Sequence, residues 1–80
     1  MDKEYKTLVN KALERFHFRI SASGTHAELA ARESLTRAIK SIYDTAFYID
    51  DPDALDELSI LVCAEENGDH IEPYKLGNIA

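Results

Sequence analysis

The spacing of apolar residues predicts a helix at the start of the chain. From Asp2 onward, apolar residues recur every three or four positions, and basic residues occupy the opposite side. Asp2 stands where a negative charge suits the positive end of the helix dipole. The predicted buried face consists of Tyr5, Leu8, Val9, Ala12, Leu13 and Phe16.

The pattern changes after Phe16. Phe18, Ile20 and Ala22 alternate with polar residues, and this period of two predicts a short half-buried strand that Gly24 closes. The alternative is that the first helix continues to Ile20, because no breaker separates the two patterns.

A second helix is predicted from residue 26 to residue 44 or beyond. Thr25 and Glu28 have the spacing of a capping box. Two glutamates each precede an arginine by four residues, the better order for such pairs, so these bases have local partners. The pairs are Glu28–Arg32 and Glu33–Arg37. The predicted buried face consists of Ala31, Leu35, Ala38, Ile39, Ile42 and Tyr43.

A third, short helix is predicted to begin at Pro52. Asp51 is a good N-cap residue, and proline is favoured at the first helical position. Asp53 and Asp56 then lie near the positive end of the helix dipole. From Ile60 the run ILVCA is apolar on all sides, so a helical wheel gives no single buried face, and a buried strand is favoured.

A hairpin is predicted at the C-terminal end. Asn67-Gly68 is a strong signal for a hairpin turn, and HIEPYKL, residues 70–76, would be the returning strand. Pro73 places that strand at an edge of the sheet. The predicted fold is therefore a single α+β domain over residues 1–80, ordered helix–strand–helix–short helix–β-hairpin. The alternative extends the third helix to Glu66 with Gly68 as its C-cap, which gives a three-helix bundle with an extended C-terminal tail.

Composition indicates an ordinary soluble protein. Apolar residues make up 45% and charged residues 30% of the 80 residues. The chain has no apolar run long enough to cross a bilayer, and its N-terminal stretch does not resemble a signal peptide. Its single cysteine, Cys63, cannot form an internal disulfide and is predicted to be buried. These features predict a cytoplasmic location.

The charge is distributed unevenly along the chain. Residues 1–43 carry eight basic and five acidic side chains, and residues 44–80 carry ten acidic side chains and one basic one. The two halves therefore have net charges of +3 and −9, which add up to −6. The acidic half should repel nucleic acid and anionic membranes and attract a basic protein surface.

The sequence offers little catalytic or metal-binding chemistry. The acids in DDPDALDE lack the alternation and the glycine of a calcium loop. Three histidines and Cys63 have no spacing typical of zinc ligands. No nucleophile motif occurs, and SASGTH lacks the glycines and the lysine of a phosphate-binding loop. We therefore predict a non-enzymatic protein without a metal or cofactor.

The acid-rich half is the predicted functional surface. We expect a small inhibitor or regulator that docks its carboxylates on a basic protein, one that normally binds nucleic acid, and so acts as a nucleic-acid mimic. Small antagonists carried by phages, including anti-CRISPR inhibitors, are of this general type. Phe47, Tyr48 and Tyr74 are expected to flank the surface, although burial in the domain core would suit Phe47 equally well. The predicted partner-binding residues are Asp50, Asp51, Asp53, Asp56, Glu57, Glu65, Glu66 and Asp69.

Two other hypotheses remain open at this level. The oppositely charged halves could attract each other between copies and produce a structural or self-assembling protein, in the simplest case a homodimer. A small enzyme or metal-binding protein is the weaker alternative. A third interpretation treats the acids as a solvated surface that keeps a small protein soluble.

Overall fold

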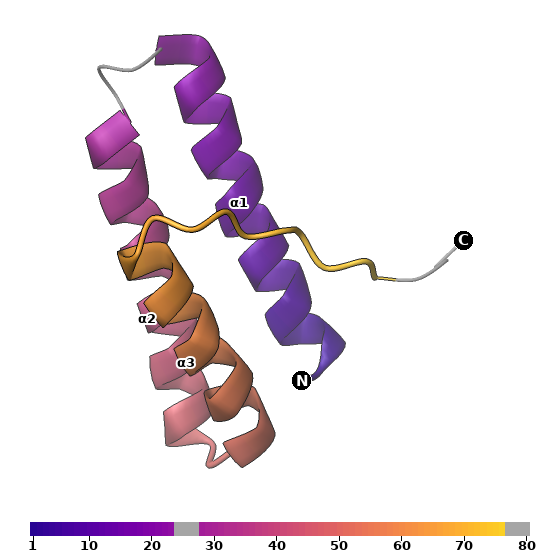
Figure 1. The fold of residues 1–80 in the computed structure, drawn as a ribbon. Helices are drawn as coiled ribbons and strands as arrows, with labels where there is room; N and C mark the ends of the chain where they lie inside the picture. The colour runs from indigo at the N-terminus through magenta and orange to yellow at the C-terminus, as the bar shows by residue number, and fades with distance from the viewer. Residues whose placement is uncertain (24–27, 77–80) are drawn as a thin grey trace.

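The computed structural model describes residues 1–23 and 28–76, and this part of the chain folds into three antiparallel helices (Figure 1). They are α1 (Lys3–Ser23), α2 (Glu28–Tyr48) and α3 (Pro52–Glu66). The central helix is α2, which packs against both α1 and α3. The described residues contain no strand. The predicted α+β fold is therefore wrong, and the alternative of a three-helix bundle with an extended C-terminal tail is confirmed. The predicted closing glycine Gly24, the capping residue Thr25 and the start of the second helix at His26 lie outside the described residues.

The predicted strand after Phe16 is the continuation of α1. Phe18 is 73% exposed, and Ala22, four residues later on the same helical face, is exposed as well. Phe16 and Ile20 share the inner face, where each is partly buried. The alternation of apolar and polar residues therefore does not correspond to a buried and an exposed side. The segment contains no proline or glycine that would interrupt the hydrogen bonding of the helix.

The predicted strand at residues 60–64 belongs to α3. Ala54 and Leu58 are fully buried, and Leu61 and Val62 continue the same face. Ile60 is 67% exposed and Cys63 is also exposed, so the prediction that Cys63 is buried is wrong. The apolar run has an inner side and an outer side, but both sides carry apolar residues, which hid the helical period.

Both turns that flank α3 use the same hydrogen-bonded ending. After α2, the N–H of Asp51 donates to the carbonyl of Ala46 and the N–H of Asp50 donates to that of Phe47. After α3, the N–H groups of Asp69 and Gly68 donate to the carbonyls of Ala64 and Glu65 in the same way. This is the Schellman motif, which needs a left-handed residue after the helix. Asp50 (φ 58°) and Gly68 (φ 78°) supply it. Asn67-Gly68 therefore ends a helix and does not turn a hairpin.

The start of α3 follows the prediction. Asp51 is the N-cap, and its carboxylate accepts a hydrogen bond from the N–H of Ala54 at 3.2 Å. Pro52 occupies the first helical position. The N-cap and the proline are local signals, so the sequence located this helix start without knowledge of the packing.

The core lies where the three helices meet. On α2 the buried residues are Ala31, Leu35, Ile39, Ile42 and Ala46, while the predicted Ala38 and Tyr43 are only partly buried. On α1, the predicted Leu8 is 47% exposed and Phe16 is partly buried. The remaining members of the core are Tyr5, Val9, Ala12, Leu13, Ala54, Leu58 and Ile71.

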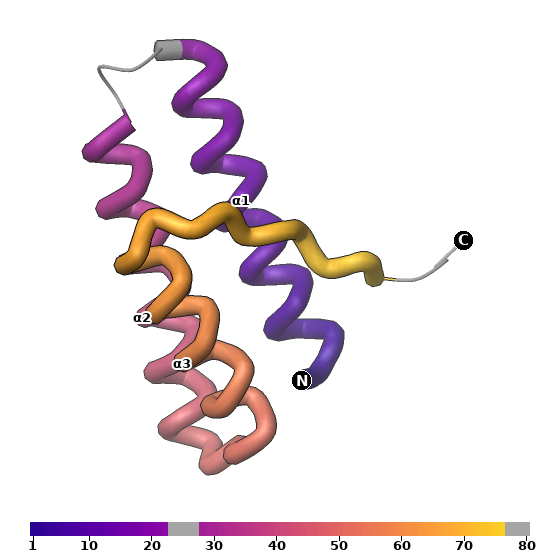
Figure 2. Tube along the Cα trace, in the orientation of Figure 1, coloured from indigo at the N-terminus to yellow at the C-terminus, as the bar shows by residue number. Residues whose placement is uncertain are grey.

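The last described residues, 67–76, form an extended segment that we call the strap. The strap runs across the middle of α1 (Figure 2) and buries Ile71 in the core. The amide of Asn10 in α1 holds its backbone at Tyr74: Nδ2 donates to the Tyr74 carbonyl at 2.9 Å, and Oδ1 accepts from the Tyr74 N–H at 2.8 Å. The predicted returning strand is thus extended, but it pairs with a side chain of α1 and with no strand.

Candidate docking surface at the α2–α3 corner

Four of the eight predicted partner-binding carboxylates are occupied within the fold. Asp51 caps α3. Glu57 accepts a hydrogen bond from the Tyr74 hydroxyl at 3.0 Å. Glu65 is buried, and Glu66 lies 3.6 Å from the Lys40 ammonium in an exposed ion pair. These four carboxylates serve the structure, which leaves Asp50, Asp53, Asp56 and Asp69 without a basic partner among the described residues.

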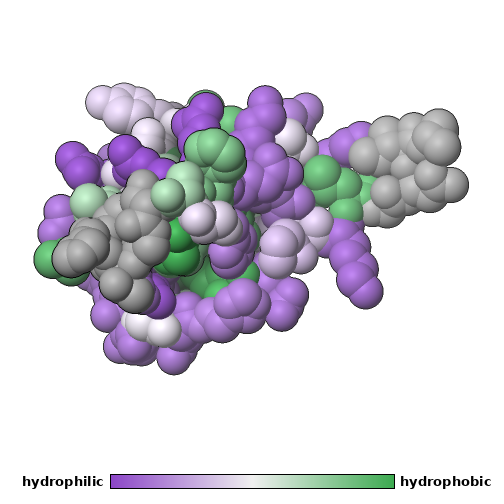
Figure 3. Space-filling model, turned by 90° about the horizontal axis from the view of Figure 1, so that it is seen from above, coloured by the Kyte–Doolittle hydropathy of each residue, from purple (hydrophilic) through white to green (hydrophobic). Residues whose placement is uncertain are grey.

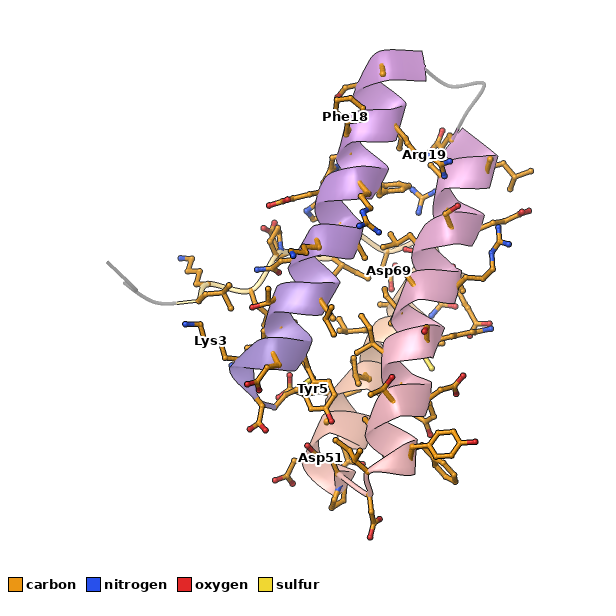
Figure 4. All side chains as sticks on the ribbon, turned by 180° about the vertical axis from the view of Figure 1, so that it is seen from behind. Lys3, Tyr5, Phe18, Arg19, Asp51 and Asp69 are labelled. Carbon is orange, nitrogen blue, oxygen red and sulfur yellow. The ribbon has the colours of Figure 1, made fainter. Side chains whose placement is uncertain are left out.

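The eight predicted residues fall into two groups, and no hairpin among the described residues brings these groups together. Because α3 runs to Glu66, the two groups lie at opposite ends of a helix about 20 Å long. Asp51 and Asp69, one from each group, are well separated along the bundle (Figure 4). The eight residues therefore do not form one continuous surface.

The larger exposed group surrounds the turn between α2 and α3, which we call the corner, residues 47–56. Three consecutive apolar side chains point into solvent there: Phe47 is 64%, Tyr48 90% and Ile49 64% exposed. Exposed carboxylates of Asp50, Asp53 and Asp56 follow within the next seven residues. The short turn keeps the two sets together, so the corner combines an apolar centre with an acidic margin.

The corner has the composition of a protein interface. Aromatic residues are enriched at the centres of such interfaces, and a polar margin surrounds them. Isolated exposed apolar residues are common on proteins, whereas three consecutive ones that are each more than half exposed are candidates for binding. The sequence indicated Phe47 and Tyr48 as flanking residues, and the structure decides that Phe47 lies outside the core. Tyr74, the third predicted flanking aromatic, is partly buried and donates a hydrogen bond to Glu57, the residue that follows the corner in α3.

The role of Glu65 was not predicted from the sequence. Its carboxylate lies 3.8 Å from the guanidinium of Arg32 and 3.5 Å from the Thr36 hydroxyl, both on α2. Burial raises the pKa of Glu65 above its usual value, and Arg32 and Thr36 offset only part of this effect. The signal was present, because a helix that buries Ala54 and Leu58 also turns Glu65 inward.

Arg32 connects all three helices. It keeps the predicted local pair with Glu28 at 3.6 Å, which confirms that part of the second helix. It also lies over the ring of Phe16 on α1 and contacts Glu65 on α3. Arg37, in contrast, donates to the backbone carbonyl of Glu33 at 3.4 Å, and the predicted Glu33–Arg37 ion pair does not form.

The other reactive side chains stay apart. The rings of His17 and His70 have centroids 6.4 Å apart, and His70 Nε2 lies 3.1 Å from a Glu72 carboxylate oxygen. No group of three metal-ligating side chains converges within residues 1–23 and 28–76. No helix in the same ranges is both long and apolar enough to cross a membrane.

Comparison with known proteins gives a family and no activity. Neither a curated protein nor a solved structure matches the chain. One family model, described as a domain of unknown function (DUF4754), matches residues 1–80. The match spans the whole sequence, and the chain therefore belongs to the DUF4754 family.

Proposed function

We propose that this protein is a non-catalytic inhibitor or regulator that docks its α2–α3 corner on a basic protein in the cytoplasm. The observation that carries the proposal is the adjacency in the corner of three exposed apolar side chains and three carboxylates that form no ion pair with the described residues. The apolar centre would supply most of the affinity, and the carboxylates would supply steering and specificity. The free thiol of Cys63 is consistent with a reducing compartment.

The partner that fits has an apolar pocket bordered by lysines and arginines. Basic surfaces of this kind commonly hold the phosphates of DNA or RNA. A protein that covers such a surface with carboxylates competes with nucleic acid for it. The proposed role is therefore that of a nucleic-acid mimic directed at a nucleic-acid-binding protein.

The proposal no longer uses all eight predicted carboxylates. Neutralising Asp51 would remove the cap of α3, and neutralising Glu57 would weaken the contact with Tyr74, so loss of binding in those variants would be ambiguous. Asp53 and Asp56 are exposed, and their side chains form no hydrogen bond or ion pair with the other described residues. They are the residues to change.

The test is a pull-down with tagged protein at about 0.1 M and about 1 M salt, where the Debye length falls from about 10 Å to about 3 Å. The corner variants are Tyr48→Ser and the double variant Asp53→Asn/Asp56→Asn. We expect the wild type to retain a basic protein at low salt, and both variants to lose it by about tenfold or more. A DNA or RNA oligonucleotide should displace the captured protein.

A double variant at the other end of α3, Glu66→Gln/Asp69→Asn, is the matched control. It removes two negative charges, as the corner double variant does. The exposed ion pair that it breaks is worth at most about 1 kcal/mol. It should bind like the wild type. If both double variants lose the partner equally, net charge and not the corner is responsible, and the proposal is wrong. Circular dichroism of each variant checks that the helices persist.

A further inference from the structure

A groove lies between α1 and α2, away from the corner. It encloses about 760 Å³, a size that can receive several side chains, and neither α3 nor the strap lines it. Its apolar lining includes Ala12 and Phe16 from α1 and Ala31, Leu35 and Ala38 from α2. Small residues on α2 keep the groove open. Figure 3 views the molecule from the end where α1 leads to α2 and shows apolar atoms exposed among hydrophilic ones.

The groove lies on the face of the α1–α2 pair that is opposite α3. On α2, Arg32 and Thr36 contact α3, whereas Ser34 and Ala38, on the other side of the helix, line the groove. In Figure 1, α3 and the strap lie in front of α1 and α2. No other described helix covers the opposite face, and Phe18, which borders the groove there, remains 73% exposed.

The margin of the groove is basic. Arg15, Arg19 and Glu14 line it, which gives a local net charge of +1. Arg19 donates a hydrogen bond to the Ser34 hydroxyl across the groove at 2.8 Å, and Figure 4 shows its side chain directed toward α2. Among the described residues neither guanidinium has an ion-pair partner.

The basic residues on the other side of α2 differ from Arg15 and Arg19 in this respect. Arg32 and Lys40, the bases of α2 nearest to α3, are both ion-paired with carboxylates of that helix. Arg15 and Arg19 thus have charge left for an acidic group from outside the molecule. The occupant of the groove should present apolar side chains next to carboxylates.

We propose that the occupant is the α2–α3 corner of a second copy of this chain. The corner offers Phe47, Tyr48 and Ile49 to the apolar lining and Asp50, Asp53 and Asp56 to the two arginines. Lys3 and Lys11 are also exposed on α1, but they do not line the groove and match only the charge of the corner. The groove matches both properties.

Charge decides between two ways of pairing. A symmetric contact of groove with groove would bring Arg15 and Arg19 of both copies together, against the single Glu14 of each. A groove-to-corner contact pairs opposite charges instead. Such a head-to-tail contact uses different surfaces on the two copies, so each copy has one groove and one corner left to bind further copies, in a ring or an open chain.

This assembly is independent of the proposed partner, although both use the corner. Self-association would cover the corner at high protein concentration, and a basic partner would have to compete with the groove of another copy. The protein would then be available as an inhibitor mainly as a monomer.

The test is sedimentation velocity at protein concentrations from about 10 µM to about 1 mM, the range in which small transient interfaces become populated. The groove variant is Arg15→Gln/Arg19→Gln and the corner variant is Asp53→Asn/Asp56→Asn. We expect the wild type to form oligomers larger than dimers at low salt. Each variant alone should remain monomeric, because the substitution should raise the dissociation constant of the groove-to-corner contact about tenfold or more.

The equimolar mixture of the two variants is the decisive sample. The intact corner of the groove variant can enter the intact groove of the corner variant, and no further contact is left. The mixture should therefore contain a heterodimer and nothing larger. Glu66→Gln/Asp69→Asn is the control and should assemble like the wild type.

Three results would each overturn this inference. They are a wild type that stays monomeric over the whole range, a corner variant that still self-associates, and a mixture without heterodimer. The groove variant separates this proposal from the proposed function, because it keeps the corner and should still bind a basic partner.

Discussion

Asp50 and Asp51 are adjacent carboxylates with different structural roles. Asp50 lies in the left-handed region that ends α2, whereas the side chain of Asp51 caps α3. The sequence alone treats them as two members of one acidic cluster. The structure assigns each of them a separate effect on stability, and each effect can be measured.

Replacing Asp51 with alanine should destabilise the protein. Its carboxylate accepts the hydrogen bond from the Ala54 N–H, and loss of an N-cap side chain typically costs about 1 kcal/mol. Urea denaturation followed by circular dichroism measures the change. Asp53→Ala, which removes a nearby charge but no cap, is the control and should cost less. Equal losses would mean that helix-dipole charge, and not the cap, stabilises this helix start.

Replacing Asp50 with glycine should have the opposite effect. A residue with φ 58° is strained when it carries a Cβ, and glycine adopts this conformation without the penalty. We expect a gain of about 0.5 kcal/mol in the free energy of unfolding, reduced by the greater freedom of glycine in the unfolded chain. Asp50→Val, with a β-branched side chain at the same position, should lower stability. A destabilised glycine variant would contradict this interpretation.

Glu65 should make stability depend on pH. Burial raises the pKa of Glu65 in the folded protein above the ordinary value of a glutamate, so the protonated form is the one that folding favours. This contribution is fully present below the unfolded pKa and is lost as the pH rises through the folded one. Glu65→Gln should therefore be more stable than the wild type at pH 7.

The difference between the two proteins should disappear below about pH 4, where the wild-type carboxyl is protonated in both states. Denaturation curves from pH 3 to pH 8 measure it. A Gln variant that is less stable at pH 7 would mean that the contacts with Arg32 and Thr36 outweigh the cost of burial.

At the scale of single elements, α3 is the helix whose inner side was hardest to predict. Its run from Ile60 to Ala64 is apolar throughout, while one of its inner positions is Glu65. An exposed isoleucine and a buried glutamate each reverse the usual pattern. The faces of α1 and α2 keep the usual pattern, and their helical periodicity was read correctly for most positions.

Two alanine substitutions on α3 should separate its inner and outer sides. Leu58 is fully buried, so Leu58→Ala should cost about 2–5 kcal/mol through lost burial and the resulting cavity. Ile60 is 67% exposed, and Ile60→Ala should change stability by less than about 0.5 kcal/mol. Thermal and urea denaturation measure both. Similar costs for the two would show that the residues at 60–64 do not follow this helical orientation.

At the scale of the whole molecule, the strap joins the two ends of the chain. Asn10 and Tyr74 are 64 residues apart, yet they exchange two hydrogen bonds. Burial is the main cause that raises the pKa of Tyr74 to about 12, and the hydrogen bond to Glu57 is the second cause. The strap covers a side of α1 that α3 does not reach, and a few specific polar contacts hold it there.

Asn10→Ala should loosen the strap without melting the helices. It removes both hydrogen bonds to Tyr74, at about 1 kcal/mol each, and should lower stability by about 1–2 kcal/mol. Hydrogen exchange at the Tyr74 amide should become faster, while amides in α2 keep their relative protection. Asn10→Asp, which keeps the acceptor and loses the donor, should show an intermediate effect. Unchanged exchange at Tyr74 would contradict the strap contact.

Features that depend on residues within one or two helical turns were predictable from the sequence. These are the cap at Asp51 with Pro52, the first helix as far as Phe16, the second helix, most of the buried positions of both, and the Glu28–Arg32 pair. The exposed acids of the corner were also identified in advance. All of them follow from local propensity, spacing and helix-dipole charge, which act before any long-range packing.

Which side of each helix another segment covers depends on long-range packing and was not predictable from the sequence. Packing extends α3 to Glu66, buries Glu65 against Arg32, and leaves the predicted acids at the two ends of α3. It also left the groove open and pinned the strap to Asn10. These features join residues far apart in the chain, and local periodicity carries no information about a neighbour that packing brings close from dozens of residues away.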